Sequence, residues 1–333
     1  MSLCVIDIFE RGVFFLKGVT TKNKKLQKRK KMSRDAKKKQ MKLWSFCIIP
    51  MLLVFVLSYI PMYGIVIAFK DFKYDKGIFG SPWVGLNNFK FFFESNEFVR
   101  IVWNTLYMNF LFIVIGMSAA IILAILLYEL TSARKVKIFH TILITPHFLS
   151  WVVVSYMLYS FISPTNGLFV KALEHLGMGK IDFYSMPKAW PVIFVIVDVW
   201  KRVGMDSILY YSSMMGIDES LYEVAYLEGA NKWQKARYVT IPMLMPMIVL
   251  LAIMKIGAIF RADFGLFYQL PRNIGTLYIT TDVVDTYIFR NLRELGNIGM
   301  SSAVGVLQSV VGFILILITN AVSKKIDPDY GLF

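Results

Sequence analysis

The sequence predicts an all-α integral membrane protein with six transmembrane helices. Hydrophobic residues make up 56% of the 333-residue chain, and the mean hydropathy is +0.56. A soluble chain cannot bury so much apolar surface, so lipid must cover part of it. The chain also contains several uncharged stretches longer than the roughly 20 apolar residues that a helix needs to cross the hydrocarbon layer.

The predicted spans differ in whether charged residues lie only at their ends or also within them. Four are long uncharged stretches, which lie within residues 43–69, 101–128, 138–170 and 295–323. Two more are apolar but interrupted. Residues 189–215 carry four charged side chains, and residues 238–260 contain Lys255 and begin with two prolines. Proline is tolerated in membrane helices because neighbouring groups can satisfy the freed carbonyls, so we count six spans.

The distribution of charge predicts the orientation. The first 45 residues hold 14 of the 37 Lys and Arg residues and 3 of the 22 Asp and Glu residues. Lysine clusters beside a span hold a segment in the cytoplasm and attract anionic lipid, which we favour over nucleic-acid binding. The prediction is a basic cytoplasmic extension (1–42), a transmembrane domain (43–323) and a cytoplasmic tail (324–333), with both termini inside.

Motifs for enzyme chemistry and metal binding are absent from the sequence. Residues 177–181 read GMGKI, which lacks both the first glycine and the final Ser or Thr of a phosphate-binding loop. The three histidines, His140, His147 and His175, are too far apart to predict a metal site. We therefore expect no catalytic residues and no metal or other cofactor on this chain.

The loop between the fourth and fifth predicted spans has a regular pattern. Asp218 is followed by acid and apolar residues that start a helix, and Gly229 interrupts that helix. A second helical stretch, 232–238, leads into Pro242. This pattern predicts a helix–glycine–helix hairpin at the membrane face, in which Gly229 provides either a positive-φ turn or a close approach.

This loop resembles the EAA loop of binding-protein-dependent ABC importer permeases. The family's positions are filled, at the family's spacing, by Glu223, Ala225, Gly229, Val239, Ile241 and Pro242. Val224 departs from the pattern at the first of the family's two alanines.

Other segments extend the resemblance over about residues 45–333. The carbohydrate-importing, maltose-type branch is indicated by WVGLNNFKFFF, WNTLYMN and DVWKRVG. The subgroup that imports plant-wall or uronic-acid-containing oligosaccharides is indicated by TPHFLSWVVVS and the ending DPDYGLF.

The resemblance implies a type I ABC importer permease fold in the bacterial plasma membrane. Residues 216–238 would form the coupling loop, which seats in a groove of a separate ATPase. In it Glu223 would pair with a basic residue of the ATPase, Ala225 would permit close seating, and Gly229 would form the turn. The partners implied are a second, similar permease, two ATPase subunits that bind ATP and Mg, and an extracellular sugar-binding protein.

Charges within the fourth predicted span form a second candidate site. Asp198, Arg202 and Asp206 share one helix face, and Lys201 and Trp200 lie beside them. Charges at bilayer depth are costly, so they are expected to pair or to face water. They either line the substrate pathway or form a self-neutralised structural ladder, and the sequence leaves both open.

Two further alternatives concern the fifth span and the function class. Lys255, Arg261 and Asp263 lie toward its outer end, where they are expected to snorkel to the membrane surface or to meet the binding protein. Intramembrane charge is also compatible with an ion-coupled secondary transporter of a polar solute. A membrane-anchored scaffold acting through the basic extension is a third class.

Overall fold

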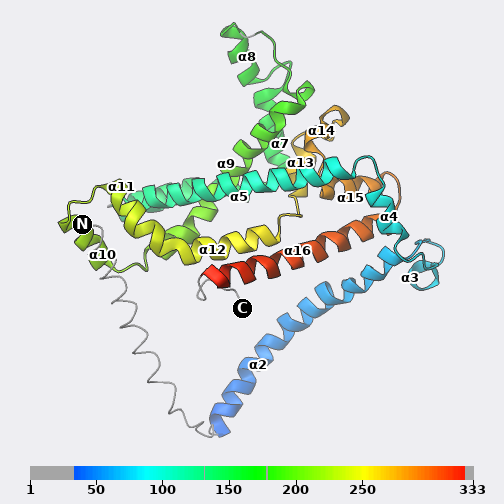
Figure 1. Ribbon diagram of the computed structural model, residues 1–333, viewed down its shortest axis with the longest axis horizontal. Helices are drawn as coiled ribbons and strands as arrows, with labels where there is room; N and C mark the ends of the chain where they lie inside the picture. The colour runs from blue at the N-terminus through cyan, green and yellow to red at the C-terminus, as the bar shows by residue number, and fades with distance from the viewer. Residues whose placement is uncertain (1–33, 131, 178, 327–333) are drawn as a thin grey trace. The chain divides into compact units, whose positions relative to one another are not determined.

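The protein is seen in a computed structural model that describes residues 34–130, 132–177 and 179–326 (Figure 1). Within those ranges the chain is helical and contains no strand beyond one isolated antiparallel bridge between Lys70 and Trp83. Residues 1–33, with most of the predicted basic extension, lie outside the described residues. The ending DPDYGLF (327–333) also lies outside them.

The chain divides into two units, Met1–Tyr63 and Gly64–Phe333. The described part of the first unit is a helix that changes pitch along its length. It begins as α2 (Arg34–Val54) and passes through a π-helical turn, η1 (Phe55–Tyr59). It then enters a 3-10 segment, η2 (Ile60–Phe69), which ends in the second unit. Pro61 lies in η2 and has no backbone N–H, which accounts for the irregular hydrogen bonding there.

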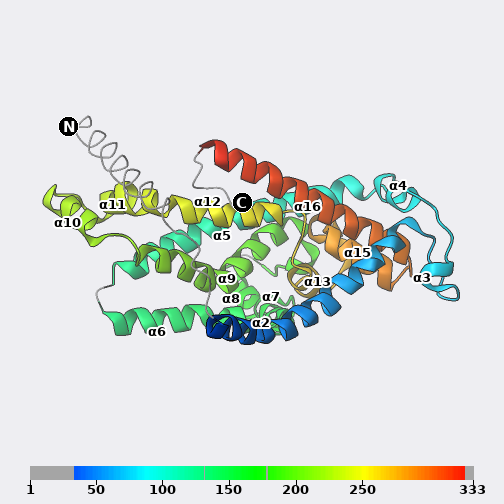
Figure 2. The ribbon, with the colours of Figure 1, turned by 90° about the horizontal axis from the view of Figure 1, so that it is seen from below.

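The second unit is built on long helices: α5 (Phe98–Tyr128), α9 (Trp190–Met214), α12 (Ile241–Gly257) and α16 (Ile298–Ile326). α9 packs chiefly on α5, and α12 packs on α16, α9 and α5 (Figures 1 and 2). The shorter helices before α9 are α3 (Gly77–Gly80), α4 (Asn87–Phe93), α6 (Ala133–Ile144), η3 (Thr145–Phe148), α7 (Trp151–Ile162), α8 (Leu168–His175), η4 (Phe183–Ser185) and η5 (Pro187–Ala189). Those after α9 are α10 (Glu219–Leu227), α11 (Lys232–Lys235), η6 (Ala236–Thr240), α13 (Phe264–Gln269), η7 (Gly275–Leu277), α14 (Tyr278–Thr281) and α15 (Val284–Arg293).

Four helical runs among the described residues are long and apolar enough to cross a membrane. They are Trp44–Phe69, Phe98–Tyr128, Lys232–Gly257 and Ile298–Lys325, and each overlaps a predicted span. α9 coincides with the fourth predicted span and has 25 residues, but its charged side chains keep it out of this group. The count of six spans and the orientation therefore remain predictions.

The third predicted span is broken. α6 and α7 together pass the same test of length and hydropathy, but they are bent by 98° at the break between them. The chain leaves the helical conformation at Leu149, where ψ is 136°. Ser150 then starts α7 by accepting a hydrogen bond from the Val153 N–H, at 3.3 Å. Pro146 in η3 favours this break because it cannot donate a backbone hydrogen bond.

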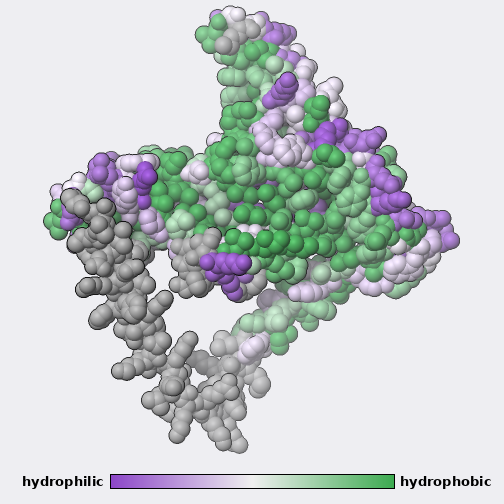
Figure 3. All heavy atoms as spheres, viewed as in Figure 1, coloured by the Kyte–Doolittle hydropathy of each residue, from purple (hydrophilic) through white to green (hydrophobic). Residues whose placement is uncertain are grey.

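Apolar and hydrophilic side chains occupy different parts of the surface of the second unit. Apolar side chains cover the long helices in Figure 3, and hydrophilic ones gather at the α10–α11 end and near α4. On α5, Ile122 and Leu126 are 58% and 61% exposed, and Phe313 on α16 is 63% exposed. Such broad exposure of large apolar groups is typical of a surface that faces lipid or a partner subunit.

Candidate functional site

The loop between α9 and α12 begins with a capped helix. Asp218 has an extended backbone, and its Oδ1 accepts the Ser220 backbone N–H at 3.0 Å, which fixes the start of α10. This hydrogen bond from the Ser220 N–H holds the pKa of the Asp218 carboxyl below its usual range. Glu219 in the first turn adds a favourable interaction with the helix dipole.

Gly229 ends α10 in a Schellman turn. Its φ is +74°, and its N–H donates to the Tyr226 carbonyl at 3.0 Å. The next N–H, of Ala230, reaches back to the Ala225 carbonyl at 2.9 Å. A Cβ built on Gly229 meets nothing within 4 Å, so within this chain the glycine is required for its backbone conformation and not for close approach.

The second arm of the hairpin is also capped. Asn231 and Gln234 form a reciprocal capping box, with two hydrogen bonds of 2.8 Å, that starts α11. The Tyr222 hydroxyl lies 3.1 Å from Thr240 Oγ1 and joins the two arms. Lys232 Nζ forms an ion pair with Glu129 Oε2, at 3.0 Å, beyond the end of α5. The hairpin is therefore anchored to a membrane helix at one point and closed on itself at another.

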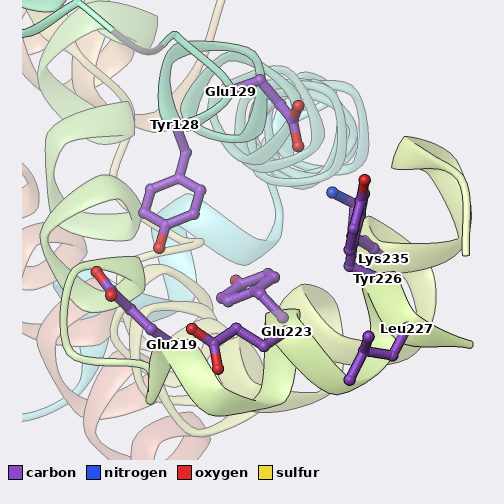
Figure 4. A pocket seen from close by; sticks show the side chains of 8 residues that line it. Tyr128, Glu129, Glu219, Glu223, Tyr226, Leu227 and Lys235 are labelled. Carbon is purple, nitrogen blue, oxygen red and sulfur yellow. The ribbon is translucent and has the colours of Figure 1, made fainter.

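A cavity of about 630 Å³ lies between the hairpin and the end of α5. It is lined by Tyr128, Glu129, Glu219, Tyr222, Glu223, Tyr226, Leu227 and Lys235 (Figure 4). Glu223 is exposed and forms no ion pair within 4.0 Å among the described residues. Leu227 is 84% exposed and Trp233 is 70% exposed, which gives the hairpin an apolar outer surface as well.

The six predicted coupling residues lie along the hairpin and at the start of α12. Glu223 and Ala225 lie on α10, and Gly229 lies at the turn. Val239 lies in η6, and Ile241 and Pro242 form the first turn of α12. The helix–glycine–helix prediction is confirmed in its geometry. The coupling role of these residues remains a prediction.

Three of the four charged residues of α9 lie at a second cavity, of about 310 Å³, between α5, α9 and the end of α12. Arg202 joins two carboxylates there. Its Nε lies 2.7 Å from Asp198 Oδ1, and its Nη2 donates to Asp263 Oδ2. Asp263 also accepts a hydrogen bond from Trp151 Nε1, at 2.9 Å, so α9 is connected to α7 and to the start of α13.

Asp206 and Lys201 have partners outside their own helix. Asp206 pairs with Lys255 of α12, with 2.8 Å between Oδ2 and Nζ. Lys201 Nζ donates to the carbonyls of His147 and Pro146, at 2.7 and 3.4 Å, and lies 5.1 Å from the centre of the Trp151 ring. Lys201 thus stabilises the break between α6 and α7.

The predicted pathway residues are brought together only in part. Asp198, Arg202 and Asp206 line the second cavity, whereas Lys201, which is buried, and Trp200 are not among its lining residues. The i,i+4 pair of Asp198 and Arg202 is present, but Asp206 finds its partner across the helix interface. Sequence reasoning gave Asn109 no role, although this residue lines the cavity. An amide within an apolar span was the available signal.

Comparison with known proteins decides the family. The protein LplB of Bacillus subtilis is 33% identical over 287 residues, which cover 86% of this chain and 89% of LplB. The polygalacturonan/rhamnogalacturonan transport system permease protein YteP of the same organism is 33% identical over 291 residues, which cover 87% and 90%. The chain belongs to the sugar ABC transporter permease family. No protein-family profile matches it.

Solved structures agree with this permease assignment. Two crystal structures of a bacterial ABC transporter that imports the acidic polysaccharide alginate match with TM-scores of 0.79 and 0.78. The identities are 30% and 29%, and the matches cover 87% and 89% of this chain and 97% and 98% of the solved chains. One of them contains a periplasmic protein with a bound alginate pentasaccharide. The protein is therefore a permease with the ABC importer permease fold, built of helices throughout the described ranges.

Proposed function

We propose that this permease carries oligosaccharides inward across the bacterial plasma membrane, using ATP hydrolysed by a separate chain. The observation that carries the proposal is the exposed hairpin of α10 and α11. It is capped at both arms, ends α10 at Gly229 and presents Glu223 without an ion pair among the described residues. A rigid, exposed helix with an unpaired carboxylate is suited to a groove on a partner subunit.

The rest of the assembly follows from the same proposal. The hairpin lies on the cytoplasmic side, as do both termini, and the chain crosses the membrane six times. A second permease completes the pore, and two ATPase subunits bind ATP and Mg. An extracellular binding protein delivers the sugar, which is supported by the periplasmic protein in the alginate transporter structure. ATP-driven closure of the ATPases moves α10 and opens the pore to the other side.

Coupling is tested with Glu223→Lys and Gly229→Leu in the reconstituted complex. Both variants should assemble with their partners and lose ATP hydrolysis stimulated by the loaded binding protein. Charge reversal removes the ion pair with the ATPase, and leucine is strained at a φ of +74°. Glu174→Lys, in exposed α8, makes the same charge change away from the hairpin and should retain stimulation. Normal stimulation in both hairpin variants contradicts the coupling role.

The energy source is tested with proteoliposomes that contain the complex. Uptake should need ATP on the side of the hairpin and should persist without an ion gradient. Uptake driven by an ion gradient without ATP contradicts the proposal and favours the ion-coupled secondary transporter.

A further inference from the structure

The segment between α12 and α13, residues 258–263, is not helical, yet its backbone is held firmly. Side chains from three other helices bind it. Asn109 Nδ2 of α5 donates to the Ile259 and Arg261 carbonyls, at 2.8 and 3.2 Å. Gln308 Nε2 of α16 donates to the Phe260 carbonyl at 2.8 Å. The Ala262 N–H donates to Asp285 Oδ2 of α15, at 2.7 Å. We call residues 258–263 the α12–α13 linker.

The linker lies at the outer end of the predicted fifth span, 238–260, where helical backbone gives way to non-helical backbone. Ala258, Arg261, Ala262 and Asp263 line the 310 Å³ cavity, so the linker forms part of its wall. Because side chains from α5, α15 and α16 bind its backbone, the linker holds the Cα atoms of Arg261 and Asp263 in fixed positions at the cavity.

All but one of the charged side chains that line the cavity form ion pairs with one another. Asp206 is neutralised by Lys255, and Asp198 and Asp263 share Arg202. Lys201, which does not line the cavity, also interacts electrostatically with Asp263 and Asp198. The remaining charged residue of the lining is Arg261.

Arg261 is exposed and forms no ion pair within 4.0 Å among the described residues. Asp285 interacts with it electrostatically but does not line the cavity. The Oδ2 atom of Asp285 already accepts hydrogen bonds from the Ala262 N–H and from Gln308. The guanidinium of Arg261 is thus the cavity's available anion-binding group.

We propose that Arg261 binds the carboxylate of an acidic sugar unit as it passes this cavity, and so sets the permease's preference for charged over neutral oligosaccharides. The inference rests on the proposed import function. A guanidinium presents paired N–H groups that match the two oxygens of a carboxylate, and a neutral hydroxyl gains much less from the same contact. The other basic groups at the cavity are occupied by carboxylates of the protein itself, so they offer no selectivity for acid.

The test compares an acidic oligosaccharide with a neutral one of the same length. Proteoliposomes carrying the complete importer with its binding protein are given trigalacturonate or its fully methyl-esterified form, each preloaded on the binding protein at saturation. The readout is the ratio of the initial uptake rates of acid and ester. Arg261→Gln should lower this ratio on the order of tenfold, since a hydrogen bond to a charged group is lost. Arg261→Lys should restore part of it, because the charge returns without the paired geometry.

Arg293→Gln is the matched control. Arg293 is exposed at the end of α15 and lies outside the cavity lining, so its removal should leave the ratio unchanged. An unchanged ratio in Arg261→Gln overturns the proposal, as does an equal loss of both substrates or an equal fall in Arg293→Gln. If the wild-type importer takes up neither sugar with ATP, the proposed import function for these sugars fails, and the role of Arg261 fails with it.

Discussion

Asp206 of α9 and Lys255 of α12 form an ion pair of 2.8 Å, although 49 residues separate them in the sequence. Both side chains are about two-thirds shielded, with exposures of 27% and 33%. The pair joins α9, which carries three of the cavity's six charged residues, to α12, the helix that continues from the hairpin. Any movement of α12 relative to α9 must keep this pair intact or break it.

Removing one member of this pair should destabilise the protein more than removing both. Lys255→Met leaves Asp206 without its cation, and Asp206→Asn leaves Lys255 without its anion, whereas the double variant leaves neither charge uncompensated. We expect a coupling energy of about 0.5–3 kcal/mol from the double-mutant cycle, measured by thermal unfolding in detergent. Additive effects of the two single variants indicate that the pair contributes nothing to stability.

Replacing Lys201 should weaken the connection between α9 and the α6–α7 break. Lys201→Met keeps the length of the side chain but removes the lysine donor from the carbonyls of His147 and Pro146, and Pro146 keeps the Leu149 N–H at 3.2 Å. The expected loss is on the order of 1–3 kcal/mol, because these partly buried carbonyls lose a charge-assisted hydrogen bond. Hydrogen exchange measured by mass spectrometry should show faster exchange at 145–151 than in the wild type. Unchanged exchange there contradicts the role given to Lys201.

Gly204 should not accept any side chain. A Cβ added there would lie 2.0 Å from the Leu143 carbonyl oxygen of α6, which is backbone and cannot rotate away. Gly204→Ala should therefore lower stability by at least about 1–3 kcal/mol, the usual cost of overpacking. Gly305→Ala in α16 is the control, since a Cβ at Gly305 meets nothing within 4 Å. Equal thermal unfolding temperatures for the two variants argue against tight packing of α9 on α6.

The start of α10 should depend on pH. Because the folded pKa of Asp218 lies below its usual value, the stabilisation is present above the ordinary carboxyl range and is lost as the pH falls through the folded pKa. Hydrogen exchange of residues 218–222, corrected for its intrinsic pH dependence, should accelerate over that acidic window. Asp218→Asn keeps an acceptor oxygen and should remove the pH dependence while retaining protection. The same acceleration in Asp218→Asn would assign it to another group.

Local features of the structure could be predicted from the sequence, and contacts between distant segments could not. Gly229 predicted the end of α10 because a positive-φ turn leaves a local signal. The Asp198–Arg202 pair followed from helical spacing alone. In contrast, Lys255 was expected to snorkel or to meet the binding protein, since no periodicity relates it to Asp206. The bend between α6 and α7 was missed because a hydropathy profile carries no information on the direction of the helix axis. Pro146 is also compatible with a straight membrane helix.

The bend between α6 and α7 has a consequence for the lipid that surrounds the protein. Each helix has 12 residues, or about 18 Å at 1.5 Å per residue. Neither alone matches a hydrocarbon layer of about 30 Å, and at 98° the two do not add up end to end. The hydrocarbon beside this segment must therefore be covered in part by other helices, and α9 packs on both α6 and η3.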